Sequence, residues 1–234
     1  MLVRNRMTRN PVTVTTDTSL KDAFELLRSR PFRHLPVVDK EGKLAGIVTE
    51  RSLVYASPTP ATTLSVFEVE YILSHTSIGQ VMHSPVITVG PDLPIEEAAR
   101  IMVDHRIGCL PVIAPETGAE SGKTGAESGK LIGIISDTDI FRVFVEGLGG
   151  GHPSTRITVV IPEEVGSLAR VAGCIVALGG NIYSLGTFRG EKAEERVVTL
   201  RLEGVDRESA VRALEADGIQ VVSVWEPPAS VTTD

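Results

Sequence analysis

Two twelve-residue stretches decide the fold of this chain, because one is a close copy of the other. Residues 42–53 read GKLAGIVTERSL, and residues 129–140 read GKLIGIISDTDI. In each copy a short apolar run follows a Gly-Lys pair and ends at a hydroxyl residue, Thr49 or Ser136. A short apolar run between turn residues is typical of a buried strand, and a hydroxyl residue is a common helix cap. Each stretch therefore predicts a strand that passes directly into a helix.

The similarity extends outward from these stretches into two complete repeats. The first runs from Met7 to Leu53, and the second runs from Met82 to Ile140 around an insert. Each copy of such a repeat is one structural unit. A unit of about 45 residues buries too little apolar surface to be stable alone. The two copies are therefore predicted to pack together about a pseudo-twofold axis.

Each repeat predicts the same order of elements, β-α-β-β-α. Apolar residues at i, i+3, i+4 and i+7 mark the helix after the first strand. Ser19 or Thr18 is expected to cap this helix in the first repeat, and Asp92 before Pro94 is expected to open it in the second. The predicted strands are Pro11–Val14, Leu35–Val38, Leu44–Val48, Val86–Val89, Leu110–Ile113 and Leu131–Ile135, and the closing helices begin near Glu50 and Asp137.

The second repeat carries an insert, residues 116–130, in which TGAESGK occurs twice in tandem. A phosphate-binding P-loop needs four residues between its glycines and a helix directly after it. This insert has three residues between Gly118 and Gly122 and leads into a strand. We interpret it as a solvated loop lengthened by duplication.

After the repeats, the glycines of 147–151 predict a flexible joint, and the remaining chain predicts the order β-α-β-β-α-β. That order is typical of a ferredoxin-like sandwich, whose sheet keeps one face or edge available for pairing. The predicted strands are Arg156–Ile161, Ile182–Phe188, Arg196–Leu202 and Ile219–Trp225, and the helices are Ser167–Leu178 and Arg207–Ala216. The predicted divisions are repeat 1 at 1–56, a linker with a helix at 57–80, repeat 2 at 81–146, a Gly-rich linker at 147–154, the C-terminal domain at 155–226 and a tail at 227–234.

Composition excludes several function classes. The net charge of −7 and the aromatic content of 4% argue against a nucleic-acid partner. No apolar run reaches the roughly 18 residues of a membrane span, and Met1–Arg6 lacks the apolar core of a secretory signal, so we expect a cytoplasmic protein without a membrane partner. Two cysteines do not suggest a disulfide framework. We find no Ser/His/Asp order, Cys/His pair or metal-ligand spacing, and we therefore expect no catalytic or metal-binding residues and no enzyme activity.

These motifs carry a resemblance to known families. HLPVV at 34–38 with GIVTERSL at 46–53, and GCLPVI at 108–113 with GIISDTDI at 133–140, resemble a pair of CBS domains, a Bateman module. VIPEEVGSL at 160–168 and GNI at 180–182 resemble an ACT domain. The whole arrangement is similar to the AcuB-type proteins named for acetoin utilisation. The resemblance implies an α+β (α/β) fold with a CBS pair followed by a ferredoxin-like ACT domain.

The resemblance also implies a ligand, since CBS pairs commonly bind adenine nucleotides in the cleft between the repeats. In the family motif Gly-h-h-Ser/Thr-x-x-Asp, the helix start attracts a phosphate and the Asp binds the ribose. The second repeat keeps Ser136 and Asp139, whereas the first keeps Thr49 but has Ser52 in place of the Asp. The implied nucleotide-binding residues are Thr88, Val89, Pro111, Ile135, Ser136 and Asp139 at the stronger site, and Thr13, Val14, His34, Pro36 and Thr49 at the weaker one.

Several alternatives remain open at these residues. Asp139 has the position of a helix cap, and His34 precedes a buried strand, so both also have a structural interpretation. ACT domains typically bind amino acids beside the loop before the first helix, which implies Val165 and Gly166, with Asn181 and Ile182 facing them. This chain has Glu-Glu-Val-Gly where the family usually has Asp-Arg-Pro-Gly, and the alternative is an ACT domain that only mediates dimerisation.

The sequence thus predicts a ligand-sensing regulatory protein, a homodimer that acts on an unknown protein partner. The expected regulatory ligand is AMP, ADP or ATP, with an amino acid at the ACT domain and no catalytic cofactor. One alternative is a dimeric scaffold that binds no nucleotide. Another is a CBS pair that binds a different adenosyl ligand such as S-adenosylmethionine.

Overall fold

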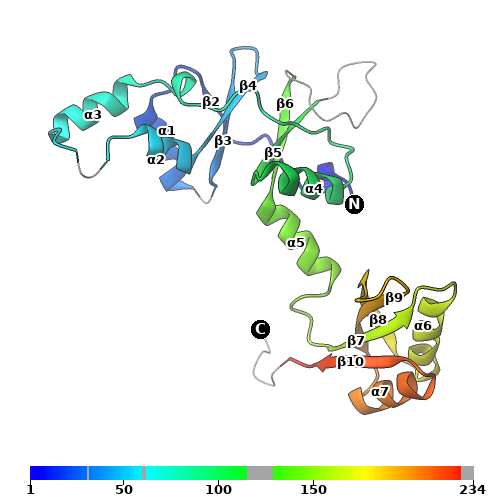
Figure 1. The fold of residues 1–234 in the computed structure, drawn as a ribbon. Coiled ribbons are helices and arrows are strands. Elements are labelled where there is room, and N and C mark those ends of the chain that lie inside the picture. Colours follow the sequence, from blue (N-terminus) through cyan, green and yellow to red (C-terminus); the bar gives the residue numbers. More distant parts are fainter. Residues whose placement is uncertain (31, 60–61, 115–128, 228–234) are drawn as a thin grey trace. The chain divides into compact units, whose positions relative to one another are not determined.

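The computed structural model describes residues 1–30, 32–59, 62–114 and 129–227. These residues form two compact units, Met1–Ile140 and Phe141–Asp234. Most of the duplicated insert and nearly all of the predicted tail lie outside the described residues. Figure 1 shows the elements of each unit.

The first sheet has the order β2-β3-β4 and is covered by two helices. β3 and β4 form an antiparallel hairpin, and the Asp39 carboxylate holds its turn by accepting the N–H groups of Glu41 at 3.0 Å and Lys43 at 2.8 Å. Ser19 caps α1 as predicted, accepting the N–H of Asp22 at 3.1 Å. The elements are β2 (Val14–Thr15), α1 (Leu20–Ser29), β3 (His34–Val38), β4 (Leu44–Thr49), α2 (Glu50–Ala56) and, in the predicted linker, α3 (Val66–His75) and the 3-10 turn η2 (Ile78–Gln80).

The second sheet has the order β1-β6-β5, and two predictions about its repeat are wrong. The strand predicted at Val86–Val89 is reduced to one bridge between Val89 and Val112, because only Val89 forms ladder hydrogen bonds there. Pro94 is the N-cap residue of α4, since Asp92 turns instead to an ion pair with Arg4 at 2.5 Å. The elements are the 3-10 turn η1 (Val3–Asn5), β1 (Thr8–Arg9), α4 (Ile95–His105), β5 (Cys109–Ile113), β6 (Leu131–Ser136) and α5 (Asp137–Gly147).

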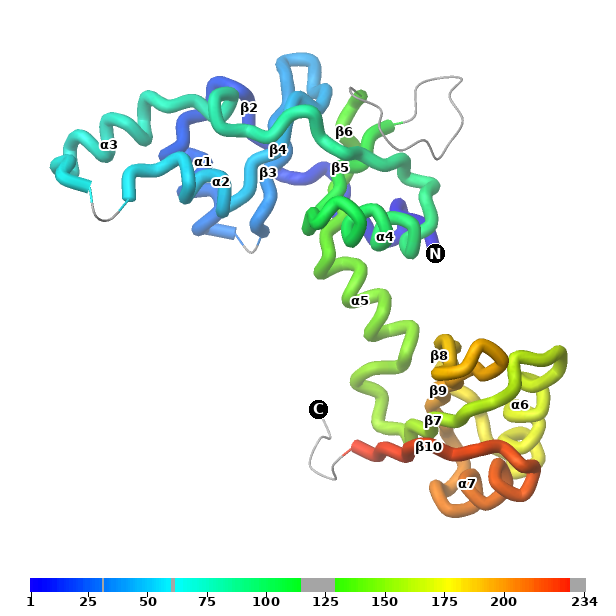
Figure 2. Tube along the Cα trace, viewed as in Figure 1, coloured from blue at the N-terminus to red at the C-terminus, as the bar shows by residue number. Residues whose placement is uncertain are grey.

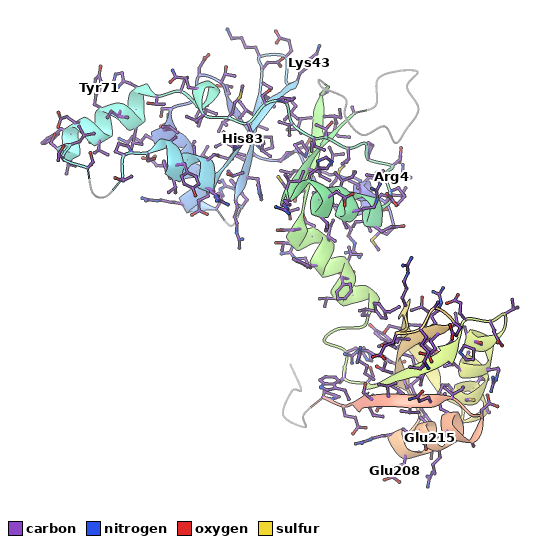
Figure 3. All side chains as sticks on the ribbon, in the orientation of Figure 1. Arg4, Lys43, Tyr71, His83, Glu208 and Glu215 are labelled. Carbon is purple, nitrogen blue, oxygen red and sulfur yellow. The ribbon has the colours of Figure 1, made fainter. Side chains whose placement is uncertain are left out.

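The two repeats exchange the segments that precede them. β1, at the start of the chain, pairs with β6 of the second repeat through Thr8 and Ile134. In return, Ile78 is buried in the core of the first repeat, and His83 pairs with Ile47 of β4. Figure 2 shows the N terminus beside α4, and Figure 3 labels His83 beside the first sheet. Each repeat therefore completes the sheet or core of the other.

Two glycines receive the exchanged segments. A Cβ on Gly46 would lie 2.5 Å from the Sδ of Met82, and a Cβ on Gly133 would lie 2.6 Å from the Sδ of Met7. A Cβ at either position would force the methionine side chain to shift, and it would also crowd a main-chain oxygen, that of His83 at 3.1 Å or that of Thr8 at 3.0 Å. The pseudo-twofold relation predicted from the repeats thus extends to the methionine that covers each glycine.

The C-terminal unit is the predicted ferredoxin-like sandwich, with an antiparallel sheet in the order β10-β7-β9-β8. One face of the sheet packs against α6 and α7, and we refer to the other as the open face. The elements are β7 (Thr155–Pro162), α6 (Ser167–Ala177), β8 (Asn181–Arg189), β9 (Glu195–Glu203), α7 (Arg207–Ala216) and β10 (Gln220–Trp225). The core consists of Ile157, Val159, Ile161, Val171, Ile175, Val198, Leu200, Leu202, Ala210, Leu214 and Ile219.

The glycine-rich segment before β7 differs from the predicted flexible joint. Residues 148–154, which we name the strap, are bound to the open face by Arg201. The Arg201 guanidinium donates to the main-chain oxygens of Leu148 at 3.1 Å, His152 at 3.0 Å and Ser154 at 3.3 Å. The His152 ring also stacks on Tyr183 at 3.8 Å between centroids. The strap is therefore an ordered part of the C-terminal unit.

Among the residues that the structure describes, no helix combines the length and apolar character needed to cross a membrane.

Candidate functional site

Ser136 and Asp139 lie together at the point where β6 passes into α5. The Ser136 hydroxyl donates to Oδ2 of Asp139 at 2.7 Å, and the N–H of Ser136 donates to the same oxygen at 3.0 Å. The N–H of Asp139 donates back to Oγ of Ser136 at 3.3 Å. This reciprocal pattern is a capping box. Asp139 therefore does have the structural role that the sequence left open, and it holds the first turn of α5.

The first repeat builds the same cap without a carboxylate. Thr49 donates its N–H to Oγ of Ser52 at 2.9 Å, and Ser52 returns its N–H to Oγ1 of Thr49 at 3.1 Å. The Ser52 hydroxyl donates to the main-chain oxygen of Thr49 at 2.8 Å. The two helix starts thus differ in charge rather than in capping. At the capping position itself, a ligand that donates hydrogen bonds meets a carboxylate at Asp139 and a hydroxyl at Ser52.

The structure divides the other predicted nucleotide-binding residues into buried and accessible groups. Val89 and Ile135 expose 1% and 0% of their surface, so they support the site from within the core rather than facing a ligand. Val14, Pro36, Thr88 and Pro111 are buried as well. The partly exposed members of the set are Thr13, His34, Thr49, Ser136 and Asp139.

The His34 side chain of the first repeat lies close to the start of α5 in the second repeat. A Cβ on Gly108 would lie 3.6 Å from Nε2 of His34 and 3.3 Å from Oδ2 of Asp137, so these groups meet over a glycine. Burial lowers the pKa of His34 below 6.5, although the nearby Asp137 carboxylate raises it. The imidazole is therefore neutral at neutral pH. Burial also raises the pKa of Cys109 to about 12, so this buried thiol stays protonated and unreactive.

A separate groove lies between α1 and α3. It encloses about 340 Å³, and Phe24, Pro58, Val69 and Leu73 supply its apolar lining. Tyr71, labelled in Figure 3, lies on the same helix as the last two but does not line the groove. None of the predicted site residues lines this groove.

In the C-terminal unit, the loop before α6 has the exposure expected of a binding loop. Val165 is fully exposed, and Gly166 occupies the N-cap position with a φ of 93° and no side-chain cap. The loop is fixed to the β8–β9 hairpin, because the N–H of Glu163 donates to the oxygen of Glu194 at 2.8 Å and its carboxylate pairs with Arg196.

The predicted contribution of Asn181 and Ile182 to this loop is wrong. Asn181 pairs with Glu203 at one end of β9, whereas Pro162, just before the loop, pairs with Glu195 at the other end. Eight residues of strand separate the two ends, which corresponds to about 27 Å. Asn181 instead donates to Oε2 of Glu203 at 3.2 Å, and Ile182 packs against the core.

Arg156 and Arg201, on the open face of the sheet, were not among the predicted site residues. The pattern that indicates them is a charged residue on β7 and one on β9 at positions that alternate with core residues.

Comparison with known proteins places both units in families. Residues 3–58 and 78–146, more than half of the chain, match the CBS domain model, and residues 150–225 match the model of the TTHA0829-like ACT domain. A CBS domain-containing protein of Dictyostelium discoideum is 28% identical over 148 residues, which cover 63% of this chain and 94% of that protein. The inosine-5'-monophosphate dehydrogenase of Nitrosopumilus maritimus is 34% identical over 107 residues, but these cover 46% of this chain and only 19% of the dehydrogenase.

Three solved structures are also similar over the CBS pair. A putative acetoin utilization protein (AcuB) from Vibrio cholerae is 33% identical, covers 64% of this chain and 93% of its own, and has a TM-score of 0.49. CBSX2 of Arabidopsis thaliana in complex with AMP is 27% identical, with 62% and 96% covered and a TM-score of 0.47. The CBS domain pair of protein MJ0100, in complex with 5'-methylthioadenosine and S-adenosyl-L-methionine, is 25% identical, with 62% and 97% covered and a TM-score of 0.47. With its two matching segments, this chain belongs to the CBS domain family, and its C-terminal unit is a TTHA0829-like ACT domain.

Proposed function

We propose that this chain is a regulatory protein that binds an adenosyl ligand at the start of α5, with a weaker counterpart at the start of α2. The observation that carries the proposal is the Ser136–Asp139 cap, which combines a carboxylate with the positive end of an eleven-residue helix. A carboxylate has about four acceptor positions, so Asp139 can hold its cap and also accept a ribose hydroxyl. His34 adds a neutral imidazole from the other repeat.

Among adenosyl ligands, the two carboxylates in the first turn of α5 favour those with few phosphates. The first turn of this helix carries both Asp137 and Asp139. Each further phosphate of ADP or ATP adds negative charge near these carboxylates, which opposes binding. We therefore propose AMP as the preferred nucleotide, with S-adenosylmethionine as the competing candidate. CBSX2 with AMP and protein MJ0100 with S-adenosyl-L-methionine illustrate both ligands in relatives, but the proposal rests on the residues of this chain.

Titration calorimetry with AMP, ATP and S-adenosylmethionine tests this proposal. We expect AMP to bind more tightly than ATP. We expect Asp139→Asn to weaken AMP binding about tenfold, because the amide keeps a cap but replaces charge-assisted hydrogen bonds with neutral ones. Asp104→Asn is the matched control, since Asp104 is an exposed carboxylate of α4 paired with Arg100. If no adenosyl ligand binds below the millimolar range, the sensor function is excluded, and equal AMP affinity in Asp139→Asn excludes this site.

For the ACT domain, we propose that the loop at Val165 and Gly166 takes the carboxylate of an amino acid. The start of α6 supports this, because it has no side-chain cap and the N-terminus of a helix favours an anion. Calorimetry with the twenty amino acids tests it, and the absence of binding leaves dimerisation as the role of this domain.

We further propose a cytoplasmic homodimer that acts on a separate protein, and sedimentation analysis of the full chain tests the dimer.

A further inference from the structure

A row of four residues crosses the open face of the ACT sheet. Arg156 of β7 lies opposite Arg201 of β9 on one side and opposite Trp225 of β10 on the other. Ser184 of β8 lies opposite Arg201 at the far end. Directly opposite residues in antiparallel strands point to the same face. The neighbouring Ile157 belongs to the helix-covered core, so the two arginines point away from α6 and α7.

The buried member of this arginine pair lacks a counter-ion. Arg201 exposes only 7% of its surface, and its Nε and Nη1 donate to main-chain oxygens of the strap. Within the described part of the chain, no carboxylate lies within ion-pair distance of Arg201 or Arg156. Burial and the positive charge of Arg156 both lower the pKa of Arg201. In the ranges that the structure describes, Arg156 and Arg201 are therefore adjacent cations without an ion pair, since Glu203, on the same face of β9, pairs with His152 instead.

Arg156 keeps donors available beside this buried charge. Its Nη2 donates to Oγ1 of Thr199 at 3.2 Å, and Thr199 in turn lies 3.3 Å from the hydroxyl of Thr158. The other N–H groups of Arg156 have no hydrogen-bond partner among the described residues. A guanidinium with open donors beside hydroxyl groups matches the oxygens of a carboxylate or phosphate.

We propose that the open face of the ACT sheet binds a small oxyanion, a phosphate or carboxylate group, through Arg156, with Arg201 and the Thr199 hydroxyl completing the site. The strap supports this proposal, because three main-chain carbonyl groups of the strap hold the Arg201 side chain against the sheet. This site is separate from the loop at Gly166 and from the proposed nucleotide site at Asp139. An anion here would offset the repulsion between two adjacent cations.

Trp225 makes the proposal directly testable, because it is the only tryptophan of the chain and lies in the same row. Its indole is 5.3 Å from the Arg201 guanidinium carbon, so a nearby anion is expected to change its emission. The experiment titrates the full chain with inorganic phosphate, and separately with acetate, at constant ionic strength set by chloride. Two or three charge-assisted hydrogen bonds correspond to a dissociation constant on the order of 1 mM.

We expect saturable binding of at least one anion by emission and by calorimetry, with the stronger ligand identifying phosphate or carboxylate as the preferred group. Arg156→Gln is expected to weaken it at least tenfold, and Arg156→Lys is expected to give an intermediate loss, because lysine keeps the charge without the planar fork. Arg207→Gln, an exposed arginine of α7 in the same unit, is the control and should bind like the wild type. Asp139→Asn should also leave the signal unchanged, which separates this site from the nucleotide site. No saturable binding up to about 10 mM, or equal binding by Arg156→Gln, overturns the proposal.

Discussion

At the residue scale, the similarity of the two repeats is clearest at two equivalent glycines, which have equivalent contacts. Gly46 and Gly133 occupy equivalent strand positions, and each is covered by the methionine of the exchanged segment, Met82 or Met7. Their lack of a Cβ is a packing requirement, because neither has the positive φ that glycine accommodates in turns. Substitution at either position is therefore expected to act through crowding rather than through backbone strain.

Gly133→Ala is expected to destabilise the chain by about 1–3 kcal/mol, since the added methyl group meets the Sδ of Met7 and the main-chain oxygen of Thr8. Urea unfolding measures the change. Gly173→Ala is the matched control, because no atom lies within 4 Å of its Cβ position and it lies inside α6. That control should gain about 0.5–1 kcal/mol from the better helix former. A neutral Gly133→Ala would show that Met7 moves away at no cost.

His34 makes the stability of the chain depend on pH. Since burial lowers its folded-state pKa below the ordinary 6.5, the unfolded chain binds more protons as the pH drops through that value. The free energy of unfolding should therefore fall between pH 6.5 and the folded-state pKa, and this group should add no further loss at lower pH. Urea unfolding at a series of pH values checks this. His34→Gln should flatten the slope, and His75→Gln, an exposed control, should keep it; an unchanged slope in His34→Gln would contradict the assignment.

At the scale of elements, the strap gives a short glycine-rich segment a defined position. Gly149 lies so close to the sheet that a Cβ would be 2.8 Å from both Cδ of Arg201 and Oγ of Ser184. Small residues therefore allow the segment to lie flat on the sheet, whereas composition alone suggested flexibility. Arg201 provides the hydrogen bonds that hold it there.

Arg201→Met should release the strap and lower the stability of the ACT unit by about 1.5–3 kcal/mol, because three main-chain oxygens lose a charged donor. Hydrogen exchange should report faster exchange in residues 148–154. Arg212→Met removes an exposed arginine of α7 and should leave both measurements unchanged. Unaltered exchange of the strap in Arg201→Met would mean that the Tyr183–His152 stack is sufficient to hold it.

The sequence predicted the elements whose ends carry local signals. The predicted bounds of α7, Arg207–Ala216, match the structure, because Asp206 caps the helix and Gly218 lies just beyond its end. The strand at Val86–Val89 was overpredicted, since apolar composition does not reveal whether a partner strand pairs along its whole length. The paired helix starts at Ser136 and Thr49 were predictable for the same local reason as α7.

Features that depend on distant pairing were not predicted. The placement of Asn181 beside the ACT loop ignored that a helix returns the chain to the opposite end of the sheet before β8 begins. The exchange of segments joins Thr8 to Ile134, and no local pattern reveals that contact. The exchange could have been inferred only by comparing the repeats, because Val3 and Met7 have the same spacing as Ile78 and Met82.

For the whole molecule, two units with separate cores predict two unfolding transitions. Ile157 and Leu200 belong to one core, and Leu20 and Leu35 belong to another. Calorimetry of the full chain should resolve both transitions. AMP at a hundred times its dissociation constant should stabilise only the unit at 1–140 by about 2.7 kcal/mol. A single transition, or an equal shift of both, would contradict this independence.

The exchange of segments also sets an order of events during synthesis. The partner of Thr8 is Ile134, so the first strand of the chain leaves the ribosome long before its neighbour in the sheet exists. At about 5–20 residues per second, translation of the intervening 126 positions takes roughly 6–25 s. During that interval the strands of the first repeat can pair with one another. For most of this time, however, Ile78 and His83, which complete that repeat, have not yet been synthesised. The Thr8–Arg9 strand therefore has no partner in its sheet until the second repeat has been synthesised, so this sheet forms only after translation has passed Ile134.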